Sequence, residues 1–285
     1  MILAVIVIRG LTINLLSKKM FNALWAISVV RLMIPFSIPS AFSVYSLMGS
    51  LAPGEGGYQA VGVLLTRAAG QTASMTGSAS HAANAVSIWT VVWAVGILIC
   101  AVLFCMAYWK CRKEFQTSLL VDNDFTRNWL SIHRQRCRIF VRQSSRFSSP
   151  LTYGVFHPLI LMPASTRWEN TDSLKYVFAH EYVHIRRFDS IRKLVLIAVL
   201  CVHWFNPLVW VMYILANRDM ELSCDEAVVR LFGENTKAAY ARTLIRMEEA
   251  RGDLTPLCSN FSKNAIEERI TAIMKIKKIT VFHLF

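Results

Sequence analysis

The sequence predicts an α-helical integral membrane protein that carries an α+β, mainly helical, soluble domain. Hydrophobic residues make up 54% of the 285 residues, only 17% are charged, and the mean hydropathy is +0.41. Soluble globular chains are rarely so apolar, so we expect segments that face lipid. Residues 86–109 contain no charge, whereas 26 of the 31 Lys and Arg and 17 of the 18 Asp and Glu follow Trp109. This step in charge indicates a soluble domain after an apolar span.

Residues 1–39 predict two N-terminal transmembrane helices. The second, residues 21–39, has about the length that a bilayer core requires, roughly 20 residues. Its single charge, Arg31, should face protein or an interface. The first apolar run is shorter, and Arg9 interrupts it, so we expect Arg9 to reach toward a membrane interface. For the first run the alternative is a signal-peptide core. For residues 21–39 the alternative is a buried core helix.

Residues 40–85 are rich in Gly, Ala, Ser and Thr and read as an extracytoplasmic loop. Residues 86–109 form the clearest candidate span, the third transmembrane helix. Residues 110–278 follow as one soluble domain. The apolar residues 279–285 resemble the start of a truncated fourth transmembrane helix.

The basic residues fix the expected orientation. Lys18–Lys19 and Lys110–Lys113 lie beside apolar segments and should be cytoplasmic, which makes the domain 110–278 cytoplasmic. The net charge of +13 fits contact with an anionic inner leaflet, and the bilayer is the expected partner. Nucleic-acid binding is the alternative, but no known nucleic-acid module is present, so we expect none directly. Seven scattered cysteines argue against a disulfide framework and fit a reduced compartment.

The soluble domain should be mainly helical. Thr171 is a candidate N-cap for a helix, Asn206 and Pro207 form a cap and first-turn pair for another, and Gly233 should end that helix. The expected elements are a polar helix at 112–133, a strand at 136–142, a hairpin at 151–163, and helices at 172–187, 189–204, 207–232, 236–251 and 264–278.

His180, Glu181 and His184 carry the strongest chemical signal. Histidines four apart on a helix share a face and can bind one cation, commonly zinc. The intervening Glu181 can act as general base toward an attacking water molecule. Two surface histidines without a metal are the alternative interpretation.

A catalytic zinc site needs a third protein ligand. Glu221 and Asp225, four apart on a later helix, share a face. Glu221 can complete the site and Asp225 can hold a ligand imidazole by its second nitrogen. Alone, such a pair is typical of a solvated acidic face. His203 stands beside aromatic residues, and its catalytic and structural interpretations both remain open.

Five ordered segments resemble one family. They are Arg31–Ser37 (RLMIPFS), Ser148–Pro163, His180–Asp189 (HEYVHIRRFD), His203–Trp210 (HWFNPLVW) and Glu221–Asp225 (ELSCD). Together they resemble the BlaR/MecR-type antirepressor peptidases, membrane gluzincins of bacterial sensor-transducers. The resemblance covers essentially the whole chain.

The resemblance implies a multi-pass protein of the bacterial cell membrane with a zincin-like metallopeptidase domain in the cytoplasm. His180, His184 and Glu221 would hold Zn²⁺, and Glu181 would be the catalytic base. Asp225 would not bind the metal itself but would hold one of its ligands in position. The expected activity is zinc-dependent cleavage of the protein itself, of a cytoplasmic transcriptional repressor, or of both, as in antibiotic-resistance signalling. We expect no sensor domain within the 285 residues, so the resemblance leaves open whether the stimulus is a β-lactam.

Two rival functions remain open. A membrane quality-control or prenyl-type zinc protease also combines paired histidines with a later acidic ligand. A truncated, non-catalytic signal-relay protein would keep the fold without cleavage. The sequence also leaves open whether the chain forms a homodimer.

Overall fold

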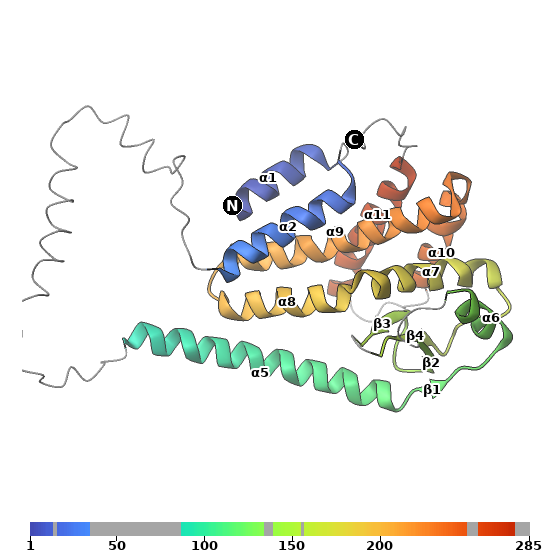
Figure 1. The fold of residues 1–285 in the computed structure, drawn as a ribbon, viewed down its shortest axis with the longest axis horizontal. Helices are drawn as coiled ribbons and strands as arrows, with labels where there is room; N and C mark the ends of the chain where they lie inside the picture. Colours follow the sequence, from blue (N-terminus) through green and yellow to red (C-terminus); the bar gives the residue numbers. More distant parts are fainter. Residues whose placement is uncertain (14–15, 35–86, 134–138, 155–156, 250–255, 277–285) are drawn as a thin grey trace, which may run out of the picture. The chain divides into compact units, whose positions relative to one another are not determined.

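The computed structural model describes residues 1–13, 16–34, 87–133, 139–154, 157–249 and 256–276. The chain divides into two compact units, Met1–Met33 with Ala94–Phe285, and Ile34–Trp93. Nearly all of the second unit, including the expected loop 40–85, lies outside the described residues, as do residues 279–285. The first unit carries the elements described below (Figure 1).

Helices dominate the described chain, and one small sheet accompanies them. This matches the expected mainly helical α+β class. The helices are α1 (Ile2–Thr12), α2 (Lys18–Met33), α5 (Ile88–Gln116), α6 (Asp124–Ile132), α7 (Thr171–Arg187), α8 (Asp189–Val202), α9 (Pro207–Phe232), α10 (Lys237–Glu249) and α11 (Pro256–Lys275). The strands are β1 (Leu119–Leu120), β2 (Phe140–Ser144), β3 (Leu151–Tyr153) and β4 (Leu159–Pro163).

The sheet has the order β1-β2-β4-β3. Strands β3 and β4 form the expected antiparallel hairpin, with Leu151 opposite Leu161. Strand β2 runs parallel to β4, with Phe140 opposite Leu159. Strand β3 therefore lies at an edge of this sheet, and it contacts α7.

Three apolar cores hold the first unit together. One joins α1, α2, α8 and α9 around Phe21 and Val209. A second packs the sheet and α6 against α7 around Ile160 and Phe178. The third joins α7, α9, α10 and α11 around Tyr240. Helices α7 and α9 belong to two cores each, so their facing sides are fixed from several directions.

Most expected helix boundaries agree with the structure because they rest on local capping chemistry. Asn206 accepts a hydrogen bond from the Leu208 amide, and Pro207 opens α9, which ends before Gly233 at φ 91°. The cap of α7 was wrongly expected at Thr171. Asn170 takes that place, and its side chain accepts from the Ser173 amide.

The expected polar helix at 112–133 is not continuous. Helix α5 extends to Gln116, β1 follows, and α6 begins only at Asp124. The reason is a capping box, in which Asn123 and Thr126 each bond the other's backbone amide and start a new helix.

Helix α5 is the described helix that is long and apolar enough to cross a membrane. Its most apolar 18-residue window has a mean hydropathy of 2.6, and none of that window is buried. Helix α1 is apolar but has only 11 residues.

Arg9 binds two acidic side chains of the folded protein. Its Nε donates to Asp219 at 2.9 Å, its Nη2 donates to Glu268 at 3.1 Å, and its side chain is only 11% exposed. Asp219 also accepts from Trp25 Nε1 at 2.7 Å. Arg9 therefore has acidic partners far along the chain, and its position at a membrane interface stays a prediction.

Candidate metal centre

The centre is built on α7. His180 and His184 lie one turn apart on the face that α9 covers, and both are buried. Their Nε2 atoms are 3.2 Å apart. The helix therefore presents two imidazole nitrogens to one point in space, as the four-residue spacing predicts.

Helix α9 brings Glu221 to the same point. Its Oε2 lies 3.4 Å from His180 Nε2 and 3.7 Å from His184 Nε2. Burial disfavours a charged Glu221, but the hydrogen bonds and charges of the two histidines outweigh it and hold its pKa well below its usual value. Two nitrogens and a carboxylate oxygen thus form a small triangle.

Asp189 fixes the orientation of His184. Its Oδ2 lies 2.8 Å from His184 Nδ1. A carboxylate is the acceptor in this pair, so Nδ1 carries the hydrogen and the Nε2 lone pair faces the triangle. Burial alone would lower the pKa of His184, but Cys224, Asp189 and Glu221 outweigh it and raise that pKa well above its usual value. The neighbours of His184 therefore favour added positive charge in the triangle, which is either a second proton on Nε2 or a cation bound by the Nε2 lone pair.

His180 is held through a relay of three side chains. Its Nδ1 lies 2.9 Å from the Tyr240 hydroxyl, which donates to Asp225 Oδ1 at 2.6 Å. Arg269 grips the same carboxylate, with Nε to Oδ2 and Nη2 to Oδ1 both at 2.7 Å. Burial opposes ionisation of Asp225, but the charge and hydrogen bonds of Arg269 hold its pKa well below the usual value.

These donors fit a divalent transition metal. Zinc takes imidazole nitrogen and carboxylate oxygen, and catalytic zinc sites use three such protein ligands and keep one position open. Ligand imidazoles in such sites commonly bond a carboxylate or another partner through their other nitrogen. His180 and His184 both have such partners, so the chemistry of the donor set agrees with a zinc site.

Cys224 is a further donor that sequence reasoning did not include. Donor atoms of His180, His184 and Cys224 all lie within 4.8 Å of one another. The thiol is fully buried and donates to the His180 carbonyl at 3.2 Å. Its three-residue spacing from Glu221 on α9 was the available signal, because that spacing places both side chains on one helix face.

Glu181 lies on the wall of the same cavity. The hydroxyl of Thr152, on the edge strand β3, donates to Glu181 Oε2 at 2.6 Å. The cavity measures about 450 Å³ and is lined by residues of β3, α7, α8, α9, α10 and α11. Among them are His180, Glu181, His184, Glu221, Tyr240 and Arg269.

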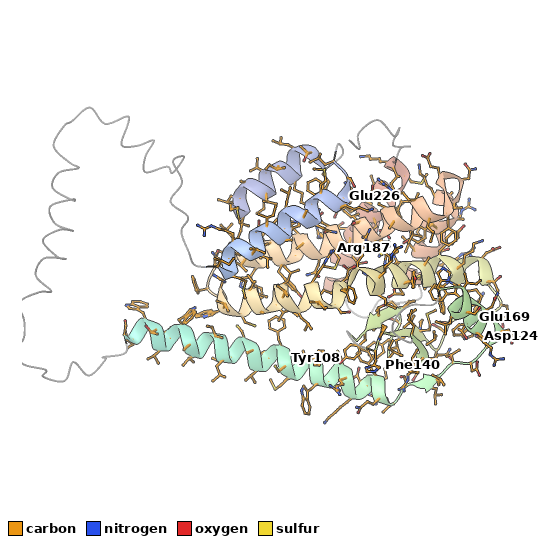
Figure 2. The ribbon with its side chains drawn as sticks, viewed as in Figure 1. Tyr108, Asp124, Phe140, Glu169, Arg187 and Glu226 are labelled. Carbon is orange, nitrogen blue, oxygen red and sulfur yellow. The ribbon has the colours of Figure 1, made fainter. Side chains whose placement is uncertain are left out.

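The remaining candidates lie elsewhere. His203 ends α8, where its Nδ1 lies 3.1 Å from the Val199 carbonyl, which supports its structural interpretation. Glu226 accepts from the Lys18 amide at 3.1 Å, beside the start of α2 (Figure 2). Glu226 and Asp219 were both left out of the expected site, and the structure gives both of them partners in α1 or α2.

The fold and the centre define a mainly helical protein with a candidate metal site between α7 and α9. The chain belongs to the BlaR1 peptidase M56 family, whose model matches residues 1–273. The sequence resemblance to this family is therefore confirmed.

Three relatives illustrate the similarity. The chain is 26% identical over 194 residues to the regulatory protein BlaR1 of Bacillus licheniformis, which covers 65% of this chain and 32% of that protein. It is 27% identical over 164 residues to the BlaR1 of Staphylococcus aureus, covering 56% and 28%. It is 19% identical over 161 residues to the methicillin resistance mecR1 protein of Staphylococcus aureus strain Mu50, covering 54% and 27%. The chain thus matches about a third or less of the length of these relatives.

Proposed function

We propose that this chain is a membrane-embedded zinc-dependent endopeptidase that transduces an external signal. Its substrates would be the chain itself, a cytoplasmic transcriptional repressor, or both. The observation that carries the proposal is the triangle of His180 Nε2, His184 Nε2 and Glu221 Oε2 on the wall of a cavity that Glu181 also lines.

In this proposal His180, His184 and Glu221 hold the metal. We favour Glu221 over Cys224 as third ligand because the Glu221 side chain is 31% exposed and lines the cavity, whereas the Cys224 thiol is buried against a backbone carbonyl. A bound zinc ion supplies Lewis acidity, which polarises a peptide carbonyl and makes water a better nucleophile at neutral pH.

The chain's own residues do the rest. Glu181 takes the proton from the attacking water and passes it to the leaving amine, as a general base and then a general acid. The Thr152 hydroxyl holds one carboxylate oxygen of Glu181, so the other is free to face the substrate. Asp225, through Tyr240, and Asp189 keep the two imidazoles in position.

The position of strand β3 at the edge of the sheet favours an extended peptide as the substrate. Leu151 and Thr152 line the cavity, and β3 pairs with β4 on one side only within the described sheet. A peptide can add to such an edge through backbone hydrogen bonds. That pairing would lay a peptide carbonyl across the cavity beside Glu181.

The signalling role and the membrane setting have separate support. Two of the similar proteins are a regulatory protein and a methicillin resistance protein, which favours signalling over membrane quality control. Helix α5 supports at least one span, and the short apolar α1 and the 16-residue α2 are proposed as the other two. The domain after α5 is proposed to be cytoplasmic.

The test uses the purified full chain in detergent. We expect one zinc per chain, lost in His180→Ala, His184→Ala and Glu221→Gln but kept in Cys224→Ser. His203→Ala is the matched histidine control and should keep its zinc. Full metal content after loss of either His180 or His184 would remove the site assignment.

The same preparations separate binding from catalysis. Glu181→Gln should keep zinc and lose cleavage of a quenched-fluorescence peptide library, with no self-cleavage fragments on gels. Glu169→Gln, an exposed acid before α7 (Figure 2), is the control and should cleave normally. Persistent cleavage by Glu181→Gln would exclude Glu181 as the base. Zinc binding without cleavage by the parent chain would favour the relay alternative.

A further inference from the structure

A groove away from the candidate centre lies between α2, α8 and α9. It measures about 530 Å³, and ten of its fifteen lining residues are apolar. The apolar lining consists of Ala23, Trp25, Ala26, Val29, Val30, Ile191, Val195, Leu196, Ala216 and Met220. The remaining lining residues are Lys19, Asn22, Arg187, Arg192 and Ser223. The proposed function gives this groove no role.

The charged lining residues are all basic, and they gather at one end. Lys19 opens α2, Arg187 ends α7, and Arg192 lies in the first turn of α8. Helices α2 and α8 run in the same direction in Figure 1, so their first turns meet at one end of the groove. No acidic residue lines it. The groove therefore has a cationic end and an apolar end.

The basic groups are available to a ligand. Arg187, labelled in Figure 2, donates through Nη1 to the neutral Ser223 hydroxyl at 2.9 Å. Within the described residues, no carboxylate pairs with Lys19 or Arg187. Arg192 is 50% exposed, and its contact with Asp189 Oδ1 is long, at 3.4 Å. Arginine forks suit phosphate oxygens in particular.

The apolar walls continue onto exposed helix faces. Val30 is 54% exposed, and Ile191 and Val195 are 40% and 39% exposed. Exposed apolar surface of this extent beside basic residues is typical of a protein surface that meets lipid. An acyl chain lying in the groove would cover these side chains.

We propose that this groove binds one anionic phospholipid of the inner leaflet. Lys19, Arg187 and Arg192 hold the phosphate, and one acyl chain runs along α2 and α8 past Ala26 and Val195. The inference rests on the membrane setting of the proposed function, in which Lys19 is cytoplasmic. Arg187 and Ser223 stand on the two helices that carry the candidate ligands, so the bound lipid would brace these helices together.

The test is photo-crosslinking of the full chain in a neutral detergent. The probe is phosphatidylglycerol with a diazirine in its acyl chain, and labelled peptides are mapped by mass spectrometry. We expect labels on the α2 and α8 segments of the groove. Excess unlabelled phosphatidylglycerol should compete, whereas phosphatidylcholine and glycerol phosphate should not.

Two variants probe the two ends of the groove. Lys19→Gln with Arg187→Gln should weaken labelling by about 25-fold, since each basic side chain near an anionic surface contributes roughly a fivefold factor. Ala26→Trp fills the apolar end without changing charge and should also abolish labelling. Lys110→Gln with Lys113→Gln removes the same charge outside the groove and should leave labelling unchanged.

Several outcomes would overturn the proposal. These are equal competition by phosphatidylcholine, equal competition by glycerol phosphate, labels spread evenly over apolar segments, or an equal loss in the Lys110 and Lys113 control. Crosslinking needs no metal and no cleavage, so it can fail while zinc binding and cleavage persist. Conversely, selective labelling of a chain without zinc would count against the peptidase proposal alone. Size-exclusion profiles of the variants identify any that do not fold.

Discussion

Tyr240 adds a second connection between His180 and Asp225, whose Nδ1 and Oδ1 atoms also lie 3.3 Å apart. Its hydroxyl lies between His180 Nδ1 and Asp225 Oδ1, and it is fully buried. Burial and the charge of Asp225 raise the pKa of Tyr240 well above its usual value, so the hydroxyl keeps its proton at neutral pH. It therefore acts as a fixed donor to Asp225 and acceptor from His180.

The variant Tyr240→Phe should bind zinc less tightly without losing its fold. It removes the nearer of two partners of His180 Nδ1, at 2.9 Å, and leaves Asp225 Oδ1 at 3.3 Å. Loss of such outer partners typically weakens metal binding about 10–100-fold. The measurement is competition for zinc against a chromophoric chelator. Tyr182→Phe is the control, because Tyr182 lies on α7, the helix of His180, but packs against Trp129 and His133. An equal loss of affinity in both variants would contradict a specific role for Tyr240.

Some residues of the candidate centre could be predicted from the sequence, and others could not. His180 and His184 could be predicted because their spacing matches the helix period, and Glu221 and Asp225 for the same reason. Tyr240 and Arg269 could not, since Tyr240 lies 60 residues from His180 and Arg269 lies 44 residues from Asp225. No local pattern specifies which distant helix will cover a site.

At the scale of elements, a buried polar contact ties α1 to α9. Arg9 binds Asp219, which is fully buried and also accepts from Trp25 of α2. Three helices therefore meet at one carboxylate. The sequence suggested a lipid interface for Arg9 because an isolated charge in an apolar segment has that default explanation. Its true partner lies 210 residues away.

Replacing Arg9 by Met should destabilise the first unit strongly. Removing one member of a buried ion pair leaves an uncompensated charge and typically costs about 3–5 kcal/mol. We expect the melting temperature in detergent to fall by roughly 10 °C.

Arg127→Met supplies the matched comparison. It removes the exposed pair with Asp122, whose two side chains are 67% and 66% exposed, and it should leave the melting temperature unchanged. Similar melting temperatures for the two variants would mean that the Arg9 contact does not hold α1 in place.

The elements themselves were largely predictable. Helices α7, α8 and α9 and the β3–β4 hairpin follow from caps, glycines and apolar periodicity that act over a few residues. The break between α5 and α6 was missed, although Asn123 and Thr126 have the right spacing for a capping box. The polar composition around them suits a helix interior and a helix start equally well.

At the scale of the whole molecule, charge placement predicts topology. Five of the 31 Lys and Arg precede Lys110, and the expected loop 40–85 contains one acid and one base. The positive-inside rule then places the ends of α2 and α5 that carry lysines in the cytoplasm.

Cysteine labelling of spheroplasts tests the topology. Cys111, exposed near the end of α5, should resist a membrane-impermeant maleimide added outside and react only after lysis. Ser80→Cys, in the expected outer loop, should react in intact spheroplasts. The reverse pattern would place the candidate centre outside the cell and remove a cytoplasmic repressor from the possible substrates.

One backbone position separates α7 from α8. Phe188 has φ 56° and ψ 40°, a left-handed conformation that non-glycine residues rarely adopt. In an unbroken helix each residue advances about 100°, so Asp189 would point roughly 140° away from His184. The break turns the chain so that the Asp189 carboxylate meets the imidazole instead. The left-handed backbone conformation of Phe188 therefore decides whether Asp189 can orient the His184 imidazole. Glycine or asparagine would preserve the left-handed conformation at position 188. A β-branched residue would instead favour one continuous helix and leave His184 without its carboxylate partner.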